Sequence, residues 1–170
     1  MDTHVAIPVE EYLSTAFDGP DREYAEGEVI ERKMGGRPHS RIQLRISRIL
    51  DALAAHHPVE AYVELRLRLA PNLYRIPDVC LFYGPQSTEE FPSQPPLVAA
   101  EVLSPDDKHA AVMQKLEEYR QFGVRHIWLI DPQRKTFAVY EAATLRQVPT
   151  LNLPEFGLAI EPKQLFLEID

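Results

Sequence analysis

The stretch Leu97-Val98-Ala99-Ala100-Glu101-Val102-Leu103 decides the fold, because it is an apolar run interrupted by one carboxylate. Seven residues of this composition predict a central strand that is covered on both faces of its sheet. Along such a strand Glu101 shares a face with Ala99 and Leu103, so its side chain belongs to a covered face. An ionised carboxylate there costs several kcal/mol unless a cation compensates it.

A second carboxylate stands near the start of the preceding strand. The stretch Tyr74–Val79, with the sequence Tyr-Arg-Ile-Pro-Asp-Val, predicts the opening of that strand and places Asp78 in it. Each acid also has a purely structural interpretation. Asp78 alone is typical of a turn residue that caps a backbone amide. Glu101 could form a structural ion pair with Arg66 or Arg68. Two carboxylates on neighbouring strands can instead meet at one hard cation, which is the arrangement that Mg²⁺ prefers.

The residues after Leu103 predict a crossover between parallel strands. A helix is expected over Asp107–Phe122, with N-cap candidates before it and Gly123 as its C′ residue. Val124–Ile130 is a second buried strand, so the strand–helix–strand run predicts a right-handed parallel connection. Thr136–Glu141 is expected to return antiparallel to it.

The rest of the chain supplies shorter elements, and the pattern as a whole predicts an α/β fold with a mixed sheet and a single domain over residues 1–170. The expected elements are a helix over Pro8–Ala16, a hairpin over Arg22–Met34 that turns near Glu26-Gly27, a helix over Pro38–His56, a strand over Ala61–Leu69, and short pieces over Leu145–Val148, Phe156–Ile160 and Lys163–Leu167.

Composition narrows the class of protein. The chain has 170 residues, of which 45% are hydrophobic and 26% charged, as in globular proteins. No apolar run approaches the roughly 20 residues that span a bilayer, so no membrane partner is expected. The start Met1-Asp2-Thr3-His4 does not predict a secretory signal. One cysteine, Cys80, excludes an internal disulfide and a multi-cysteine zinc site, and favours a cytoplasmic location.

The formal net charge of −8 is unevenly distributed. Residues 22–75 carry ten Lys and Arg residues against seven acids, a net of +3, whereas the flanking segments are acidic. Within the positive segment Arg37, Arg41, Arg45 and Arg48 recur at helical spacing. This stripe is either a solvated helix face or a ridge that follows the phosphates of a nucleic acid.

The motifs resemble those of the Uma2 family (DUF820) within the PD-(D/E)XK nuclease superfamily. The resemblance covers most of the chain, and its central block is specific. It rests on Gly27-Glu28-Val29-Ile30, His39, Arg75-Ile76-Pro77-Asp78-Val79, Glu101-Val102-Leu103-Ser104-Pro105, Lys115, Tyr119, Gly123-Val124 and Trp128-Leu129-Ile130-Asp131-Pro132. It implies a restriction-endonuclease-like mixed β-sheet core flanked by helices.

The resemblance also implies the roles of individual residues. Asp78 and Glu101 would be metal ligands for Mg²⁺ or Mn²⁺, with the carbonyl of Val102 as a possible third ligand. An additional acid is expected near the N-terminus, for which Glu28 fits best and Glu31 is the alternative.

Two positions depart from the family pattern. The superfamily lysine two residues after the glutamate is Leu103 here, and the resemblance implies that Lys115, on the following helix, replaces it. Relatives often carry an aspartate four residues before that lysine, and this chain has Ala111. His39 is more typical of a cap or a packing residue than of a catalyst.

The expected function is a Mg²⁺-dependent endonuclease that hydrolyses DNA, with Glu28, Asp78, Glu101 and Lys115 as catalytic residues and the arginine stripe on the DNA backbone. The main alternative is a catalytically inactive binding or assembly module on the same fold, which Ala111 and the acidic net charge favour. A hydrolase of smaller phosphodiesters is a third interpretation. Cutting both strands of a duplex would be simplest for a homodimer.

Overall fold

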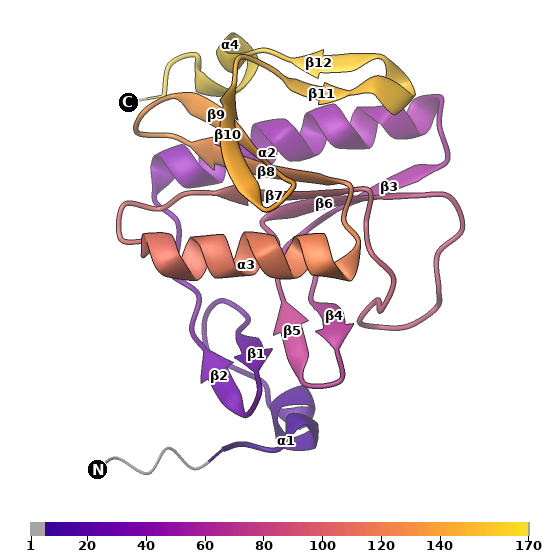
Figure 1. Cartoon of the computed structure of the whole chain (residues 1–170), viewed down its shortest axis with the longest axis vertical. Coiled ribbons are helices and arrows are strands. Elements are labelled where there is room, and N and C mark those ends of the chain that lie inside the picture. Colours follow the sequence, from indigo (N-terminus) through magenta and orange to yellow (C-terminus); the bar gives the residue numbers. More distant parts are fainter. Residues whose placement is uncertain (1–5, 170) are drawn as a thin grey trace.

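A six-stranded mixed sheet forms the centre of the molecule, in a computed structural model that describes residues 6–169 (Figure 1). Its strand order is β10-β9-β8-β7-β6-β3. Only β7 and β8 are parallel, and the other neighbours are antiparallel. The strands are β3 (Val59–Val63), β6 (Val79–Tyr83), β7 (Val98–Val102), β8 (His126–Asp131), β9 (Thr136–Glu141) and β10 (Thr144–Val148).

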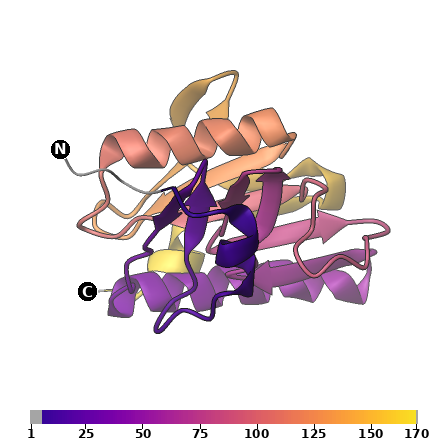
Figure 2. The same cartoon turned by 90° about the horizontal axis from the view of Figure 1, so that it is seen from below.

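Two long helices, α2 (Arg37–Asp51) and α3 (His109–Phe122), cover opposite faces of this sheet (Figure 2). On the α2 side Ile42, Ile46 and Leu50, which recur at helical spacing, are fully buried against the sheet. On the α3 side Leu116 and Tyr119 pack on alternate residues of β7 and β8. The alternation of side chains along a strand explains why one apolar strand serves both cores.

A smaller four-stranded sheet, with the order β2-β1-β5-β4, lies at the N-terminal end of the molecule in Figure 1. It consists of β1 (Glu23–Ala25), β2 (Glu28–Ile30), β4 (Leu67–Ala70) and β5 (Leu73–Arg75). The short helix α1 (Val9–Ser14) closes it through a cluster of Tyr12, Tyr24 and Tyr74. Arg66 lies over the rings of Tyr12 and Phe91 and holds Asp21.

The remaining elements lie on the α2 side of the large sheet: one follows α2 directly, and the others belong to the C-terminal end of the chain. They are the 3₁₀ turns η1 (Ala52–Ala55) and η2 (Pro154–Phe156), the hairpin of β11 (Leu151–Leu153) with β12 (Leu158–Ile160), and the helix α4 (Pro162–Phe166). Leu151, Leu153, Ile160 and Leu165 belong to the same core as α2. No helix within residues 6–169 has the length and apolarity to cross a membrane.

The predicted α/β class, the mixed sheet and the parallel crossover β7-α3-β8 are confirmed. The hairpin turning at Glu26-Gly27 and the αL residue Gly123 (φ 106°) are also as predicted. Most helices begin or end a few residues inside the predicted bounds.

Two strand predictions were wrong, for one shared reason. The expected strand Ala61–Leu69 divides between β3 and β4, and the strand expected to open at Tyr74 divides between β5 and β6. Glu64 adopts a positive φ of 50°, and Pro77 has no N–H to donate to a ladder. The breaks are adjacent, because the Glu64 amide donates to the Asp78 carbonyl at 3.2 Å. One long hairpin therefore bends from the large sheet into the small one.

Candidate active site

Asp78 lies just before β6 and Glu101 lies in β7, at the same end of two neighbouring antiparallel strands. The register pairs Val79 with Ala100, and extending it by one residue sets Asp78 opposite Glu101. The backbone amide of Val102 donates to Asp78 Oδ2 at 2.7 Å, which fixes the aspartate against the end of β7. The bend at Pro77 thus positions the first acid next to the second.

Asp78 is buried and is contacted by a histidine and an arginine. His39 Nε2, from the first turn of α2, lies 3.3 Å from Oδ2, and Arg32 Nη2 lies 3.4 Å from Oδ1. Burial alone would raise the pKa of Asp78, but the hydrogen bond from His39, the charge of Lys115 and the Val102 amide together hold it below its usual value. Asp78 is therefore an ionised carboxylate. From the sequence His39 was interpreted as a cap or a packing residue, whereas in the structure it contacts Asp78.

Glu101 is less well compensated than Asp78. The Tyr119 hydroxyl donates to Glu101 Oε1 at 2.7 Å, and Lys115 Nζ lies 2.8 Å from the same oxygen. Burial raises the pKa of Glu101, Lys115 opposes that rise, and the charges of Asp78 and Glu23 add to it, so that the pKa reaches about 7. A further positive charge beside Glu101 would therefore stabilise its ionised form.

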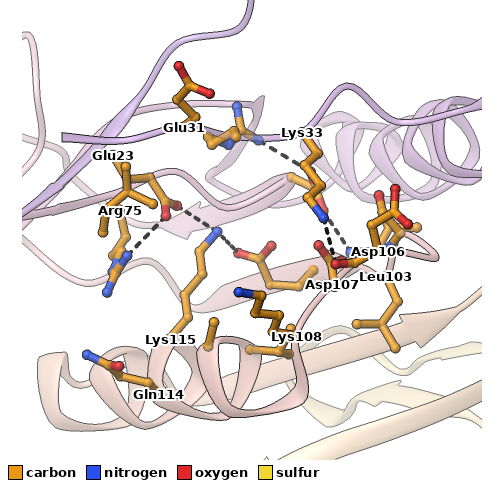
Figure 3. A pocket seen from close by; sticks show the side chains of 18 of the residues that line it. Glu23, Glu31, Lys33, Arg75, Leu103, Asp106, Asp107, Lys108, Gln114 and Lys115 are labelled. Atoms are coloured by element: carbon orange, nitrogen blue, oxygen red, sulfur yellow. Dashed lines mark hydrogen bonds and ion pairs between the residues drawn. The ribbon is translucent and has the colours of Figure 1, made fainter.

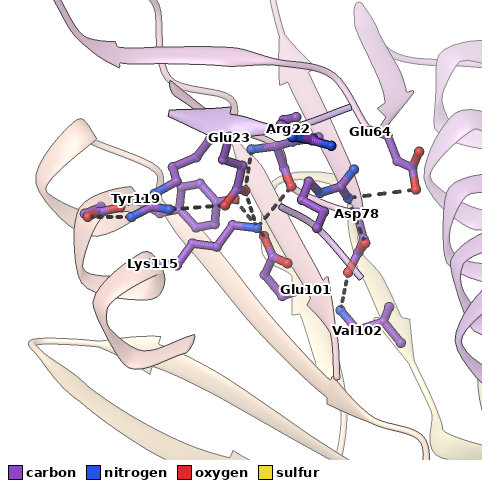
Figure 4. Close-up of polar contacts among 12 residues, drawn as sticks. Arg22, Glu23, Glu64, Asp78, Glu101, Val102, Lys115 and Tyr119 are labelled. Atoms are coloured by element: carbon purple, nitrogen blue, oxygen red, sulfur yellow. Dashed lines mark hydrogen bonds and ion pairs between the residues drawn. The ribbon is translucent and has the colours of Figure 1, made fainter. Parts of the chain in front are cut away.

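Lys115 reaches from α3 into the centre of this group (Figure 4). Its Nζ lies 2.6 Å from Glu23 Oε1 and 2.8 Å from Glu101 Oε1, and it donates to the Ile76 carbonyl at 3.1 Å. Burial alone would lower the pKa of Lys115, but these carboxylates raise it well above its usual value. The lysine is a fixed, permanently charged ammonium group rather than a solvent-facing helix residue.

Glu23 is the residue that sequence reasoning missed. It is 4% exposed at the start of β1, and its carboxylate pairs with Lys115 and with Arg75 at 3.1 Å and accepts from the Ile76 amide at 2.8 Å. Arg75 in turn binds Glu118 on α3 at 2.5 Å. The only sequence signal was an acid three residues before the predicted turn at Glu26-Gly27, which is too common to indicate a site.

The acids predicted for the N-terminal position lie farther from this centre. Glu28 is exposed on β2 and lines the cleft. Glu31 is 76% exposed and pairs with Arg22 at 3.2 Å. Within the hairpin Glu23 pairs with Ile30 and Glu28 with Ala25, so the two glutamates stand at opposite ends of β1 and β2. Glu28 stays a prediction as a catalytic residue, and Glu23 occupies the position beside Lys115.

These side chains line a cleft of about 500 Å³ between the small sheet, α3 and the loop that follows β7 (Figure 3). Both positions that depart from the family pattern, Leu103 and Ala111, are in its wall. Lys33, which donates to the Asp106 carbonyl at 2.6 Å, and Lys108 add positive charge at the loop side. The cleft therefore combines buried acids with several cations.

The donor set fits a magnesium-type ion. Within residues 6–169 no three His, Cys, Asp or Glu side chains are grouped as ligands. Mg²⁺ does not require three, because it binds through one or two carboxylates, waters and substrate phosphates. Asp78 and Glu101 supply two hard oxygen donors at one edge of the cleft, and the raised pKa of Glu101 indicates incomplete compensation. Cys80, buried inside the large sheet, offers no softer ligand there.

The arginine stripe does not face the cleft. Successive helix residues rotate by about 100°, so His39 and Gln43 lie on one side of the buried Ile42–Ile46 stripe and the arginines on the other. Gln43 donates to the Asp78 carbonyl at 3.0 Å. Arg45 instead donates to the carbonyls of Leu165 and Leu167 at 2.8 and 2.7 Å. The other three arginines, Arg37, Arg41 and Arg48, are exposed.

With this geometry established, comparison with known proteins places the chain in a family. The family model Uma2, described as "Putative restriction endonuclease", matches residues 9–168. The chain belongs to the Uma2 family. Membership confirms the resemblance that the motifs indicated, and supports a nuclease as the general class of activity.

Among solved structures, a "putative nuclease belonging to DUF820" from Anabaena variabilis ATCC 29413 has a TM-score of 0.82 and 26% sequence identity. The match covers 94% of this chain and 97% of that one. The DrdV–DNA complex, solved by cryo-EM, matches at a TM-score of 0.37 and 12% identity over 66% of this chain and 12% of that one. No curated protein matches the chain.

Proposed function

We propose that this protein is a Mg²⁺- or Mn²⁺-dependent endonuclease that hydrolyses phosphodiester bonds of DNA in the cleft. The observation that carries the proposal is the position of Lys115, whose Nζ lies between Glu101 and Glu23 while Glu101 stands opposite Asp78. Two carboxylates with an ammonium group beside them are the parts that metal-assisted phosphoryl hydrolysis needs.

Asp78 and Glu101 would hold the ion, with the Val102 carbonyl as a third donor. When bound, the ion would act as a Lewis acid on the scissile phosphate and lower the pKa of its water. Lys115 would orient the attacking water and offset negative charge that develops on the phosphate oxygens. Glu23 would keep Lys115 charged and in place, since it binds the ammonium group at 2.6 Å from the small sheet.

The cations that line the cleft would contact the DNA backbone. Arg32, Lys33 and Lys108 all line it, whereas the arginines of α2 face elsewhere. Arg32 pairs with Glu64 at 3.8 Å as well as with Asp78, so a phosphate would compete for its guanidinium group. Backbone contacts of this kind position DNA without reading its sequence.

The direct test is cleavage of supercoiled plasmid by the variants Asp78→Asn and Glu101→Gln. Each is expected to abolish Mg²⁺-dependent nicking while circular dichroism and the thermal midpoint show a folded protein. Lys163→Gln, an exposed position on α4, is the matched control and should cut as the wild type does. Nicking at the wild-type rate by either carboxylate variant would exclude the proposed site.

A non-catalytic binding module remains the second candidate, because one observation favours it. Every acid of the centre already has a cationic partner: Asp78 has Arg32, and Glu101 and Glu23 share Lys115. Calorimetric titration with Mg²⁺ and Mn²⁺ separates the two. Ion binding that Glu101→Gln removes supports the enzyme. An absence of heat with either ion, together with no cleavage, supports the module.

A further inference from the structure

A second cavity, of about 640 Å³, lies next to the cleft. Its walls are the start of α2, the loop after β7, the start of α3 and the turn between β8 and β9. The two cavities are continuous, since they share the lining residues His39, Leu103, Ser104, Asp107 and Val112. Whatever occupies the second cavity is therefore adjacent to Asp78 and Glu101.

The inner wall of this cavity is apolar. Leu103, Val112, Met113 and Leu129 form it, and they belong to the core on the α3 side of the large sheet. Pro105 and Pro132 add two flat side chains. Cavities of 300–1,000 Å³ with apolar walls and a few polar groups are typical of small-molecule sites. A wall of this kind stacks well on a planar heterocycle.

The rim of the cavity favours an anionic group. Its acids are already engaged with backbone amides: Asp107 accepts from Ser104 at 2.7 Å, and Asp131 from Gln133 and Arg134 at 2.9 and 3.0 Å. Arg134, whose side chain is 83% exposed, lies in the turn after β8 and forms a long ion pair with Asp131, with 3.9 Å between its Nε and Oδ2. The helices α2 and α3 both begin at this cavity without a side-chain cap, which adds partial positive charge.

We propose that this cavity binds the base and 5′-phosphate of one nucleotide of the substrate strand, next to the phosphodiester that is cut. The location beside the scissile bond rests on the proposed function, whereas the binding of a nucleotide does not. A base inside an intact duplex cannot reach the apolar wall, so the nucleotide must be unpaired or turned out of the helix. The preferred substrate class is accordingly DNA with a single-stranded or distorted segment at the cut.

Nucleotide binding can be measured without catalysis, in EDTA, with dAMP as the probe. The chain has three methionines, Met1, Met34 and Met113, so ¹³C-labelled methyl groups give three NMR signals. Met113 lines the cavity, whereas Met34 is 80% exposed and lines neither cavity. Saturable movement of the Met113 signal alone is expected. No movement of that signal with dAMP, or equal movement with inorganic phosphate, would overturn the base-binding site.

Two variants with matched controls test the wall and the rim. Filling the cavity with Met113→Trp should weaken dAMP binding by about tenfold in calorimetry, because the indole occupies the space that the base would take. Gln121→Trp, exposed in the last turn of the same helix, should not. Arg134→Glu should weaken it about fivefold, read from the Met113 methyl signal, whereas Arg125→Glu at the other end of β8 should leave it unchanged. Equal effects of variant and control in both pairs would overturn the assignment.

The position beside the scissile bond is tested with oligonucleotides that carry one abasic residue, moved stepwise along the cut strand. One position should slow cleavage by the wild type about tenfold, and Met113→Trp should be insensitive to that same abasic residue. Insensitivity of the wild type at every position would overturn the adjacency. Binding of dAMP at Met113 by a protein that cuts no DNA would overturn the proposed function while supporting the nucleotide site.

Discussion

The large sheet and the small sheet each place one glutamate against Lys115, and the pKa values of the two glutamates are shifted in opposite directions. Glu101 on β7 lies 2.8 Å from the ammonium nitrogen and Glu23 on β1 lies 2.6 Å from it. Burial raises the pKa of Glu101 to about 7. Burial acts on Glu23 in the same sense, but Lys115 and Arg75 overcome it and lower the pKa below 4.5.

The difference lies in what surrounds each carboxylate. Glu23 receives two cations and the Ile76 amide, whereas Glu101 receives one shared cation and the Tyr119 hydroxyl beside the charge of Asp78. The small sheet therefore delivers a balanced acid that anchors the lysine. The large sheet supplies Glu101, whose negative charge is only partly compensated by Lys115 and would be stabilised further by a divalent ion.

The largest effect is expected from removing the cation that both sheets share. Lys115→Met leaves two buried carboxylates without their common partner, and breaking a buried ion pair from one side costs about 3–5 kcal/mol of unfolding free energy. Urea denaturation measures this. Lys108→Met, an exposed lysine that lines the same cleft, should cost less than about 0.5 kcal/mol. A variant Lys115→Met as stable as the control would contradict the description of both glutamates.

The second effect separates the two glutamates directly, in metal-free buffer with EDTA at pH 7.5. Glu23→Gln should lose about 2 kcal/mol, because Arg75 and Lys115 lose a charged partner in a buried setting. Glu101→Gln should stay within about 1 kcal/mol of the wild type, since a carboxyl with a pKa near 7 gains little by ionising at this pH. Equal losses in the two variants would remove the asymmetry between the sheets.

Much of the large sheet follows from its sequence, because its signals are local. The apolar run at Leu97–Leu103, the amphipathic stripe of α2 and the glycine that ends α3 each determine their element without reference to the rest of the chain. The same locality places Asp78 and Glu101 on neighbouring strands. Lys115 was identified only through the family resemblance, since nothing in its own helix marks it.

The small sheet was poorly predicted because it depends on contacts between distant segments. Its strands have only three or four residues, and the bend at Glu64 and Pro77 that creates β4 and β5 is visible only once both halves of a hairpin are placed together. Glu23 reaches Lys115 across 92 positions of the chain, and no spacing rule connects them. The sequence therefore indicated Glu28, which fits a motif, instead of the buried Glu23.

The stability difference for Glu23→Gln should depend on pH, with a sign set by the direction of the shift. The pKa of Glu23 is lower in the folded protein than the unfolded value of 4.5, so its charged form stabilises the fold above pH 4.5. That contribution is lost as the pH falls through the folded pKa. In the Glu101→Gln background, which removes the nearby group that titrates near pH 7, the gap that Glu23→Gln adds in urea denaturation should thus be constant from pH 8 to 6 and close on further acidification. A gap that widens in acid would reverse the assignment.

The smallest effect is expected from the arginines of α2, which do not line the cleft. Because they lie beyond the buried stripe from His39, Arg41→Glu with Arg48→Glu should change DNA affinity by less than about twofold at 150 mM salt. Lys33→Glu with Lys108→Glu carries the same change of charge at the cleft. It should lower the DNA affinity by about tenfold or more. The salt dependence should also become less steep, because a protein with fewer phosphate contacts releases fewer counterions when it binds DNA. If the arginine pair had the larger effect in fluorescence polarisation, DNA would be bound along α2, and the cleft between the two sheets would need another substrate.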